Sequence, residues 1–146
     1  MAINNLTYTD DGMKFTEQFE SCRLTAYYDL KGILTVGWGH TGPEVMPGLV
    51  WTQAQADAAL LVDVQRVAQT VNTLVTISLT QNEFNALCDF AYNCGCTAFR
   101  NSTMLSLLNH EQYDLAAEQF ALWDMAGGKV VAGLIRRRTA EKQEFQ

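Results

Sequence analysis

Two acidic side chains and one hydroxyl occupy a short stretch near the start of this chain. Glu20, Asp29 and Thr35 follow one another at intervals of nine and six residues. Such a set could place a general acid, a water-orienting carboxylate and a polar helper around one glycosidic bond. A general acid must keep its proton near neutral pH. Burial beside apolar neighbours such as Phe15 and Phe19 would favour the protonated carboxyl of Glu20.

Each of these residue types also has an ordinary structural explanation. A glutamate near a helix end and an aspartate in a turn are common, and threonine is frequent in strands. From residue types alone, these explanations would be preferred. The elements that position the three side chains must therefore be considered.

The segment after the first helix predicts a β-hairpin. Residues 26–28 and 33–36 are rich in strand formers, and residues 29–32 form the turn between them. In that polar turn Asp29 should stay ionised and can orient a water molecule. Thr35, on the facing strand, offers a hydroxyl to hold the same water.

Hydrophobic periodicity predicts that the rest of the chain is mainly helical. Two capping-box signals, one at residues 52–55 and one at 80–83, start a long amphipathic helix over 53–75 and a helix that is apolar nearly all round. The second of these belongs in the middle of a core. A first helix should begin at Asp10 or Asp11 and carry Glu20 near its end. Three further helices are expected over about 101–108, 112–125 and 133–146.

The charge balance excludes some partners. The chain has 146 residues and a formal net charge of -6 at pH 7, which argues against nucleic acid as the main partner. Its basic cluster is Arg136-Arg137-Arg138. Successive helical residues turn by about 100°, so these three cannot share a face. Arg137 can pair with Glu141 on its own helix as a small surface effect, or one of the three can point toward Glu20.

No targeting or membrane segment is expected. The first eleven residues have neither a basic start nor an apolar run, and no stretch approaches the roughly 20 apolar residues that span a bilayer. The sequence therefore predicts a chain that folds in the cytosol and leaves it only with the help of another protein.

Neither a disulfide nor a metal site is predicted. Without a secretory signal, Cys22, Cys88, Cys94 and Cys96 should be reduced thiols. The spacing of the last two is too tight for a relaxed disulfide and is not that of a zinc knuckle. His40 has no second ligand at metal spacing, so a structural histidine paired with a carboxylate is expected. No cofactor is predicted.

The spacing of the three polar residues resembles that of a known family. Glu20, Asp29 and Thr35, followed by residues 36–41 (VGWGHT), look like the catalytic segment of phage-type lysozymes, the glycoside hydrolases also called endolysins. The resemblance covers about residues 13–145. It continues in the same order through residues 79–87, 98–103, 123–130 and 133–137.

This resemblance implies an activity and a site. The expected reaction is hydrolysis of the β-1,4 bond between N-acetylmuramic acid and N-acetylglucosamine in peptidoglycan, with inversion. Glu20 would be the general acid, Asp29 would orient the nucleophilic water, and Thr35 would assist it. Trp38 could stack on sugar, although core packing explains it equally well, and Arg137 is a further candidate for substrate binding.

The resemblance also implies a fold class, α+β and mainly α. A single lysozyme-like domain over residues 1–146 would have a small hairpin lobe at about 20–52. A helical lobe at about 76–146, together with the N-terminal helix, would face it across a cleft. The helix of residues 53–75 would join the two lobes.

Two other functions remain open: a lytic transglycosylase, which forms an anhydro sugar, and a non-catalytic peptidoglycan-binding protein. The presence of Asp29 and Thr35 beside Glu20 favours the hydrolase. The expected biology is a monomeric endolysin made in the host cytoplasm and released by a holin-type lesion. It would act on the periplasmic cell wall without stable membrane association.

Overall fold

Two helices begin at capping boxes, as the sequence predicts. The Thr52 hydroxyl accepts from the backbone of Gln55, whose side chain accepts in return from the Thr52 backbone. Thr80 and Glu83 make the same reciprocal pair. Each box satisfies backbone donors that a helix start leaves unpaired. The long helix α2 (Gln53–Leu74) and the central helix α3 follow from them.

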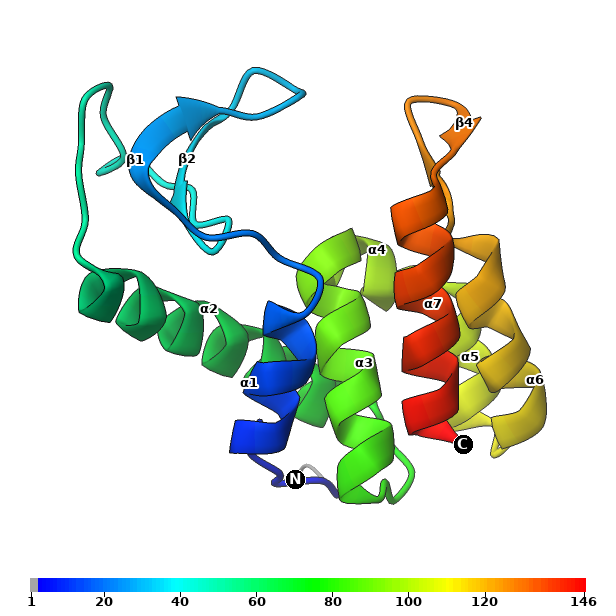
Figure 1. The fold of residues 1–146 in the computed structure, drawn as a ribbon. Helices are drawn as coiled ribbons and strands as arrows, with labels where there is room; N and C mark the ends of the chain where they lie inside the picture. The colour runs from blue at the N-terminus through cyan, green and yellow to red at the C-terminus, as the bar shows by residue number, and fades with distance from the viewer. Residues whose placement is uncertain (1–2) are drawn as a thin grey trace.

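The computed structural model describes residues 3–146 and shows a hairpin lobe and a helical lobe joined by α2 (Figure 1). In Figure 1 the β1–β2 hairpin lies above one end of α2, and the remaining helices cluster at its other end. The elements not yet given bounds are α1 (Asp10–Glu17), β1 (Arg23–Tyr28), β2 (Leu34–Gly37), α3 (Gln81–Cys94), α4 (Cys96–Arg100), α5 (Thr103–Asn109), α6 (Tyr113–Gln119), the 3₁₀ turn η1 (Phe120–Leu122), β3 (Met125–Ala126), β4 (Lys129–Val130) and α7 (Ala132–Phe145).

The hairpin lobe is built on the antiparallel pair β1–β2. Tyr27 lies opposite Thr35, and an irregularity near the start of β1 shifts the register. A later segment covers the other edge of β1, where Ala26 donates its backbone N–H to the carbonyl of Leu49 at 2.8 Å. The predicted hairpin is confirmed, and its turn holds Asp29 at the tip.

The helical lobe packs around α3, as expected for a helix that is apolar nearly all round. Helices α1, α2, α4 and α7 all contact it. Phe90 is fully buried, and its ring meets those of Phe99, Phe120 and Trp123 edge-on at 5.3–6.3 Å between centroids. Such edge-to-face contacts between buried rings are among the stronger apolar pairs.

The first helix differs from the prediction at both ends. Its N-cap is Thr9, whose hydroxyl accepts a backbone hydrogen bond, rather than Asp10 or Asp11. Those two acids lie instead in the first turn, where their negative charge interacts favourably with the positive end of the helix dipole. The helix ends at Glu17, so Glu20 follows it in the connection to β1.

The predicted helix over residues 112–125 is wrong only at its end, because the chain is no longer helical after Leu122. Helix α6 tightens into η1 and ends at Leu122, and a second small hairpin, β3–β4, follows. Gly127 and Gly128 both have positive φ, at 59° and 78°. A two-residue turn of this kind matches the twist of a tight hairpin. The glycine pair therefore makes the turn of this second hairpin.

All four cysteines are free thiols in the structure, and Cys88 is fully buried in the core. Within residues 3–146, no helix is both long enough and apolar enough to cross a membrane.

Candidate active site

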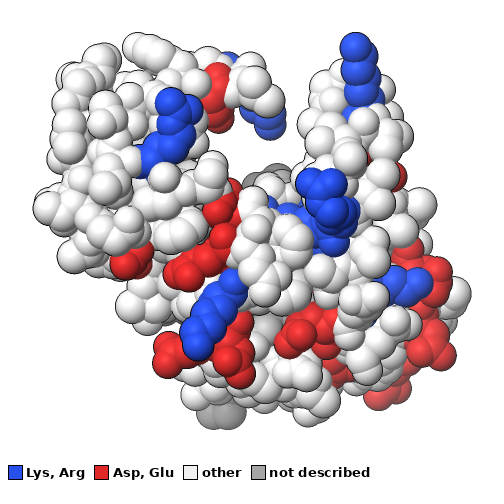
Figure 2. Space-filling model, viewed as in Figure 1, with Lys and Arg blue, Asp and Glu red and all other residues white. Residues whose placement is uncertain are grey.

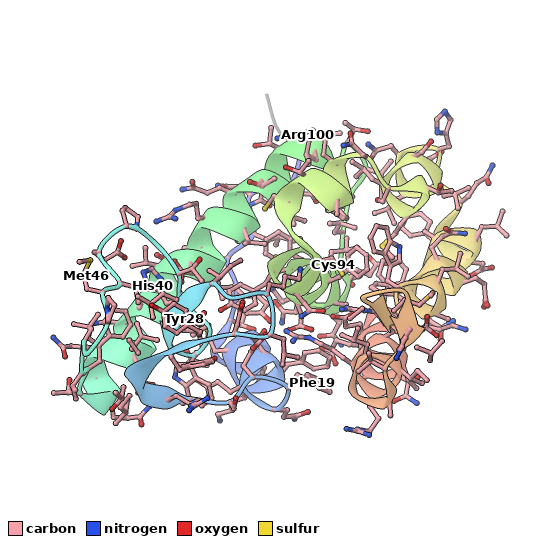
Figure 3. The ribbon with its side chains drawn as sticks, turned by 90° about the horizontal axis from the view of Figure 1, so that it is seen from above. Phe19, Tyr28, His40, Met46, Cys94 and Arg100 are labelled. Carbon is pink, nitrogen blue, oxygen red and sulfur yellow. The ribbon has the colours of Figure 1, made fainter. Side chains whose placement is uncertain are left out.

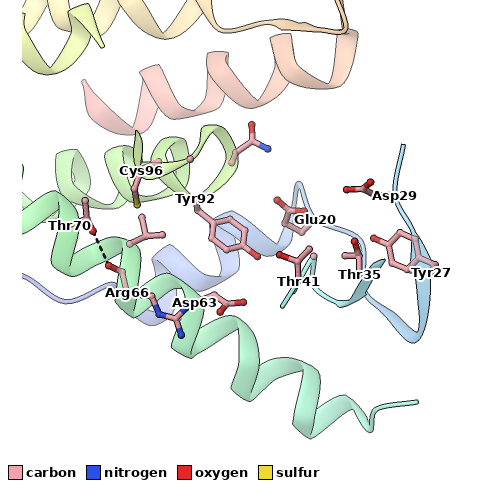
Figure 4. A pocket seen from close by; sticks show the side chains of 15 residues that line it. Glu20, Tyr27, Asp29, Thr35, Thr41, Asp63, Arg66, Thr70, Tyr92 and Cys96 are labelled. Carbon is pink, nitrogen blue, oxygen red and sulfur yellow. Dashed lines mark hydrogen bonds between the residues drawn. The ribbon is translucent and has the colours of Figure 1, made fainter. Parts of the chain in front are cut away.

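A cleft of about 850 Å³ separates the hairpin lobe from the helical lobe. Figure 2 shows the hollow from one side, with basic side chains on both arms of its mouth and acidic ones on the hairpin arm, where the lobes meet and lower on the molecule. In Figure 4, Glu20, Tyr27, Asp29 and Thr35 gather at one end of the cleft. The full lining is Glu20, Tyr27, Asp29, Thr35, Gly39, Thr41, Asp63, Arg66, Val67, Thr70, Ala91, Tyr92, Asn93, Gly95 and Cys96. The three predicted catalytic residues therefore share one cavity.

Glu20 reaches the cleft from the connection that follows α1. Its side chain is 20% exposed. The prediction of apolar surroundings is incomplete, because Arg137 donates from Nη1 to Oε1 of Glu20 at 2.8 Å. Its other oxygen, Oε2, faces Gly39, where a built Cβ would lie 3.6 Å away. Gly39 has a φ of 95°, which favours glycine and leaves this side of the carboxyl uncrowded.

Asp29 is fixed by the turn that it starts. Its Oδ1 accepts from the backbone N–H groups of Lys31 and Ile33, both at 2.8 Å. Side-chain oxygens of aspartate commonly close turns in this way. Within residues 3–146, Asp29 Oδ2 accepts no hydrogen bond from a side chain or from the backbone of the turn. One oxygen therefore builds the loop, and the other is available to a ligand.

Thr35 lies on β2, and its side chain is almost buried at 4% exposure. Its hydroxyl donates to the carbonyl of Ile33 at 2.9 Å. A hydroxyl has one donor and two acceptor sites, so Thr35 can only accept from a water in the cleft.

Arg137 connects the cleft to the helical core. Its Nε and Nη2 donate to the two carboxylate oxygens of Asp89 at 2.9 Å each, while Nη1 holds Glu20. Arg137 is 3% exposed and Asp89 is fully buried. The interpretation of an Arg137–Glu141 pair as a surface contact is therefore wrong. Arg137 Nε and Glu141 Oε2 lie 3.8 Å apart in the interior. The buried position of Arg137 favours a role in holding Glu20 over direct contact with substrate.

The contacts of Asp89 determine the pKa of its carboxyl group. Burial raises the pKa of Asp89, but hydrogen bonds with Glu141 and Arg137 outweigh burial and hold the pKa below its ordinary value. Burial also raises the pKa of the Tyr92 phenol in the cleft wall. Tyr92 therefore stays a neutral hydrogen-bond donor at neutral pH.

Trp38, the candidate for stacking on sugar, packs against the core, and so does Trp123. The Trp38 indole donates to Asp57 Oδ1 at 2.8 Å, and the ring lies against the helical core rather than in the cleft lining. Trp123 packs edge-on against Phe90. The position of Trp38 favours core packing over stacking on sugar.

Several cleft residues lay outside the predicted site. Asp63 and Arg66 come from the polar face of α2, and Tyr92 and Asn93 from the end of α3. Asp63 and Arg66 could have been predicted, because the helix that joins the two lobes was expected to lie beside the cleft and to expose its polar face there. Tyr92 was hidden in an apolar pattern, although its hydroxyl donates to the carbonyl of Trp38 at 2.9 Å.

His40 links the hairpin lobe to α2 (Figure 3). Its Nδ1 contacts Asp63 Oδ2 at 2.7 Å, and its Nε2 contacts Glu44 Oε1 at 2.5 Å. The predicted pairing of this histidine with a carboxylate is confirmed, with two partners. Burial lowers the pKa of His40, but the hydrogen bonds to Glu44 and Asp63 outweigh it and leave the pKa raised. No group of three or more metal-binding side chains is present in the part of the chain that the structure describes.

This histidine should make stability depend on pH. A raised folded-state pKa means that charged His40 stabilises the fold fully below about pH 6.5, its unfolded value, and that the contribution is lost as the pH rises through the folded value. We expect the Tm of the wild type to fall by roughly 2–4 °C more than that of His40→Gln between mildly acidic and mildly alkaline buffer. His110→Gln, at an exposed site, is the control and should behave as the wild type. Parallel Tm profiles for all three proteins would contradict the assignment.

Comparison with known proteins places this geometry in context. The family described as phage lysozyme matches residues 17–141. The endolysin of Bacillus phage PZA is 42% identical over 136 residues, which cover 92% of this chain and 53% of that endolysin. The endolysin of Acyrthosiphon pisum secondary endosymbiont phage 1 is 39% identical over 142 residues, 94% of this chain and 97% of that one. The chain spans about half the length of the Bacillus phage relatives that it matches.

A solved structure is similar over nearly the whole chain. The muramidase domain of SpmX from Asticaccaulis excentricus superposes with a TM-score of 0.89 at 34% sequence identity. The superposition covers 97% of this chain and 98% of that domain.

Proposed function

This chain belongs to the phage lysozyme family, and on that premise we propose that it hydrolyses the β-1,4 bond between N-acetylmuramic acid and N-acetylglucosamine in bacterial peptidoglycan. The observation that carries the proposal is the shared cleft, in which Glu20, Asp29 and Thr35 line one end. An acid and a water-orienting carboxylate on the walls of one cleft suit an inverting hydrolysis.

Glu20 is the general acid of this mechanism. Arg137 donates to Oε1 and a guanidinium cannot accept a proton, so the catalytic proton is carried by Oε2. That oxygen faces Gly39, where the absence of a side chain leaves room for the glycosidic oxygen. Protonation of the glycosidic oxygen by Glu20 lets the leaving sugar depart while positive charge develops at the anomeric carbon.

Asp29 and Thr35 orient the attacking water. The water donates one proton to Asp29 Oδ2 and the other to Thr35 Oγ1, because the Thr35 hydroxyl has given its own proton to Ile33. With both protons engaged, a lone pair is left for the anomeric carbon. Asp29 takes up the proton released as the new bond forms.

The chemistry of the products tests the proposal against a lytic transglycosylase. Purified peptidoglycan digested by the wild type should yield fragments that end in a reducing N-acetylmuramic acid, each with one water added across the cleaved bond. Mass spectrometry distinguishes these from anhydro-ended fragments, which lack that water. Anhydro products would overturn the hydrolase, and unchanged glycan strands would favour a binding protein.

We further propose the setting of the reaction. The protein is a monomeric endolysin, made in the host cytoplasm and released through a holin-type lesion to act on the cell wall in the periplasm. The name endolysin, which its curated relatives carry, supports this proposal. Expression with and without a holin tests it, since lysis that proceeds equally in both would remove the holin from the scheme.

A further inference from the structure

A second set of charged side chains lies behind the cleft, in the helical lobe. Asp89 on α3 and Glu141 on α7 are both fully buried, and Arg138 is 1% exposed. Charged groups are rarely buried this completely unless they are paired. Arg137 joins this set to Glu20. The set therefore forms a continuous path from the core to the proposed general acid.

One oxygen in this set has no hydrogen-bond partner. Glu141 Oε1 accepts from Arg138 Nη1, but Oε2 is buried and unpaired among the described residues. Arg137 Nε lies 3.8 Å from this oxygen and donates instead to Asp89. A bare carboxylate oxygen in the interior is costly, so an ionised Glu141 does not fit this site.

A proton on Oε2 removes the difficulty. A protonated Glu141 can donate from Oε2 to the carboxylate of Asp89. The oxygen that was unpaired then has a hydrogen-bond partner. Burial, with the hydrogen bond to Asp89, raises the pKa of Glu141 to about 10, and the same contact helps to lower the pKa of Asp89. The charged or polar groups that face this pair are Thr16 from α1, Arg137 and Arg138 from α7, and, through Arg138, Asn93 from α3.

We propose that Asp89 and Glu141 are positioning residues for the reaction, and that a proton held between them keeps Asp89 in the fork that orients Arg137 toward Glu20. This inference rests on the proposed function for its catalytic consequence. The two N–H···O bonds of the fork fix the guanidinium plane, so Nη1 has one direction left and Glu20 Oε1 lies along it. Asp89 also supplies the negative charge that Arg137 needs, so Glu20 is free to carry the catalytic proton.

Asp89→Asn tests the fork. An amide keeps the size of the side chain but replaces one acceptor by a donor that faces Arg137, and it removes the charge. We expect kcat to fall roughly 10- to 100-fold with KM changed by less than about twofold, because positioning and not substrate binding is lost. Asp114→Asn, at an exposed site on α6, is the control. Assays run well below the Tm of each variant remove the effect of reduced stability.

Two substitutions at Glu141 separate donation from charge. Glu141→Leu cannot donate to Asp89 and should lower kcat about tenfold. Glu141→Gln offers an amide N–H in place of the carboxyl proton and should restore most of the lost kcat. A merely structural role would change the Tm of both variants without this difference in kcat. Equal losses in the two variants, or a wild-type kcat in Asp89→Asn, would overturn the proposal.

The proton on Glu141 can also be observed without any activity. In carbon-13 NMR, the carboxyl signal of Glu141, assigned by its absence in Glu141→Gln, should keep the shift of a protonated acid across roughly pH 5–8, where an ordinary glutamate is ionised. A carboxylate shift in that range would overturn the inference. Because this signal requires no turnover, it stays informative if the wild type proves not to hydrolyse peptidoglycan.

Discussion

Glu20→Gln is expected to lower the rate of peptidoglycan hydrolysis by roughly 10²- to 10⁴-fold, the usual contribution of a general acid. Glutamine has the same shape and can still accept from Arg137 Nη1, so the cleft should keep its form. The amide cannot donate a proton to the glycosidic oxygen. The rate of clearing of a cell-wall suspension measures the effect, with the mass of released fragments as a second readout.

Glu17→Gln is the matched control, because it makes the same substitution three residues earlier and outside the cleft lining. It should clear walls at the wild-type rate. Comparable Tm values for the two variants would show that lost activity is not lost structure. Unchanged clearing by Glu20→Gln would remove Glu20 from the role of acid and would favour a different mechanism.

Arg138→Met is expected to destabilise the fold by about 3–5 kcal/mol, because each buried acceptor that loses its donor costs about 1–3 kcal/mol. The buried guanidinium donates to Glu141, to Asn93 and, at 2.9 Å, to the carbonyl of Trp123. Methionine fills much of the volume but leaves these acceptors without partners. A domain has only about 5–15 kcal/mol of stability in total, so the loss should be obvious in urea unfolding.

Arg136→Met provides the comparison, since Arg136 is exposed one position earlier on α7. Its free energy of unfolding should lie within about 0.5 kcal/mol of the wild type. If the two variants lose similar stability, the cost comes from removing positive charge in general and not from the buried contacts of Arg138.

The mainly helical architecture with one small hairpin was predictable from local signals, and the resemblance to phage-type lysozymes implied the rest of the fold. Two capping boxes and the apolar periodicity located α2 and α3, and the strand formers around the turn located β1 and β2. The structural relatives share this mainly helical fold with a small hairpin. The spacing of Glu20, Asp29 and Thr35 also put them on adjoining elements. The common site itself was expected from the resemblance of this spacing to phage-type lysozymes, since each residue type alone has an ordinary structural explanation.

The support behind the site was not predictable in the same way. A run of three arginines near a chain's end usually faces water, and only contacts with residues far away in sequence show otherwise. Asp89 lies 48 residues before Arg137 and within an apolar helix pattern, where a single acid gives no sign of its partner. The rotation of about 100° per residue excludes a common face for all three, but it does not reveal which two turn inward.

The contact between Arg137 and Glu20 joins residues that are 117 positions apart in the chain. Glu20 is translated well before Arg137, whose guanidinium orients it from α7. A nascent chain still on the ribosome has Glu20 without its partner until α7 emerges and docks. Under the proposed mechanism, catalytic competence therefore requires the docking of α7 and is not a property of the segment that holds Glu20 alone.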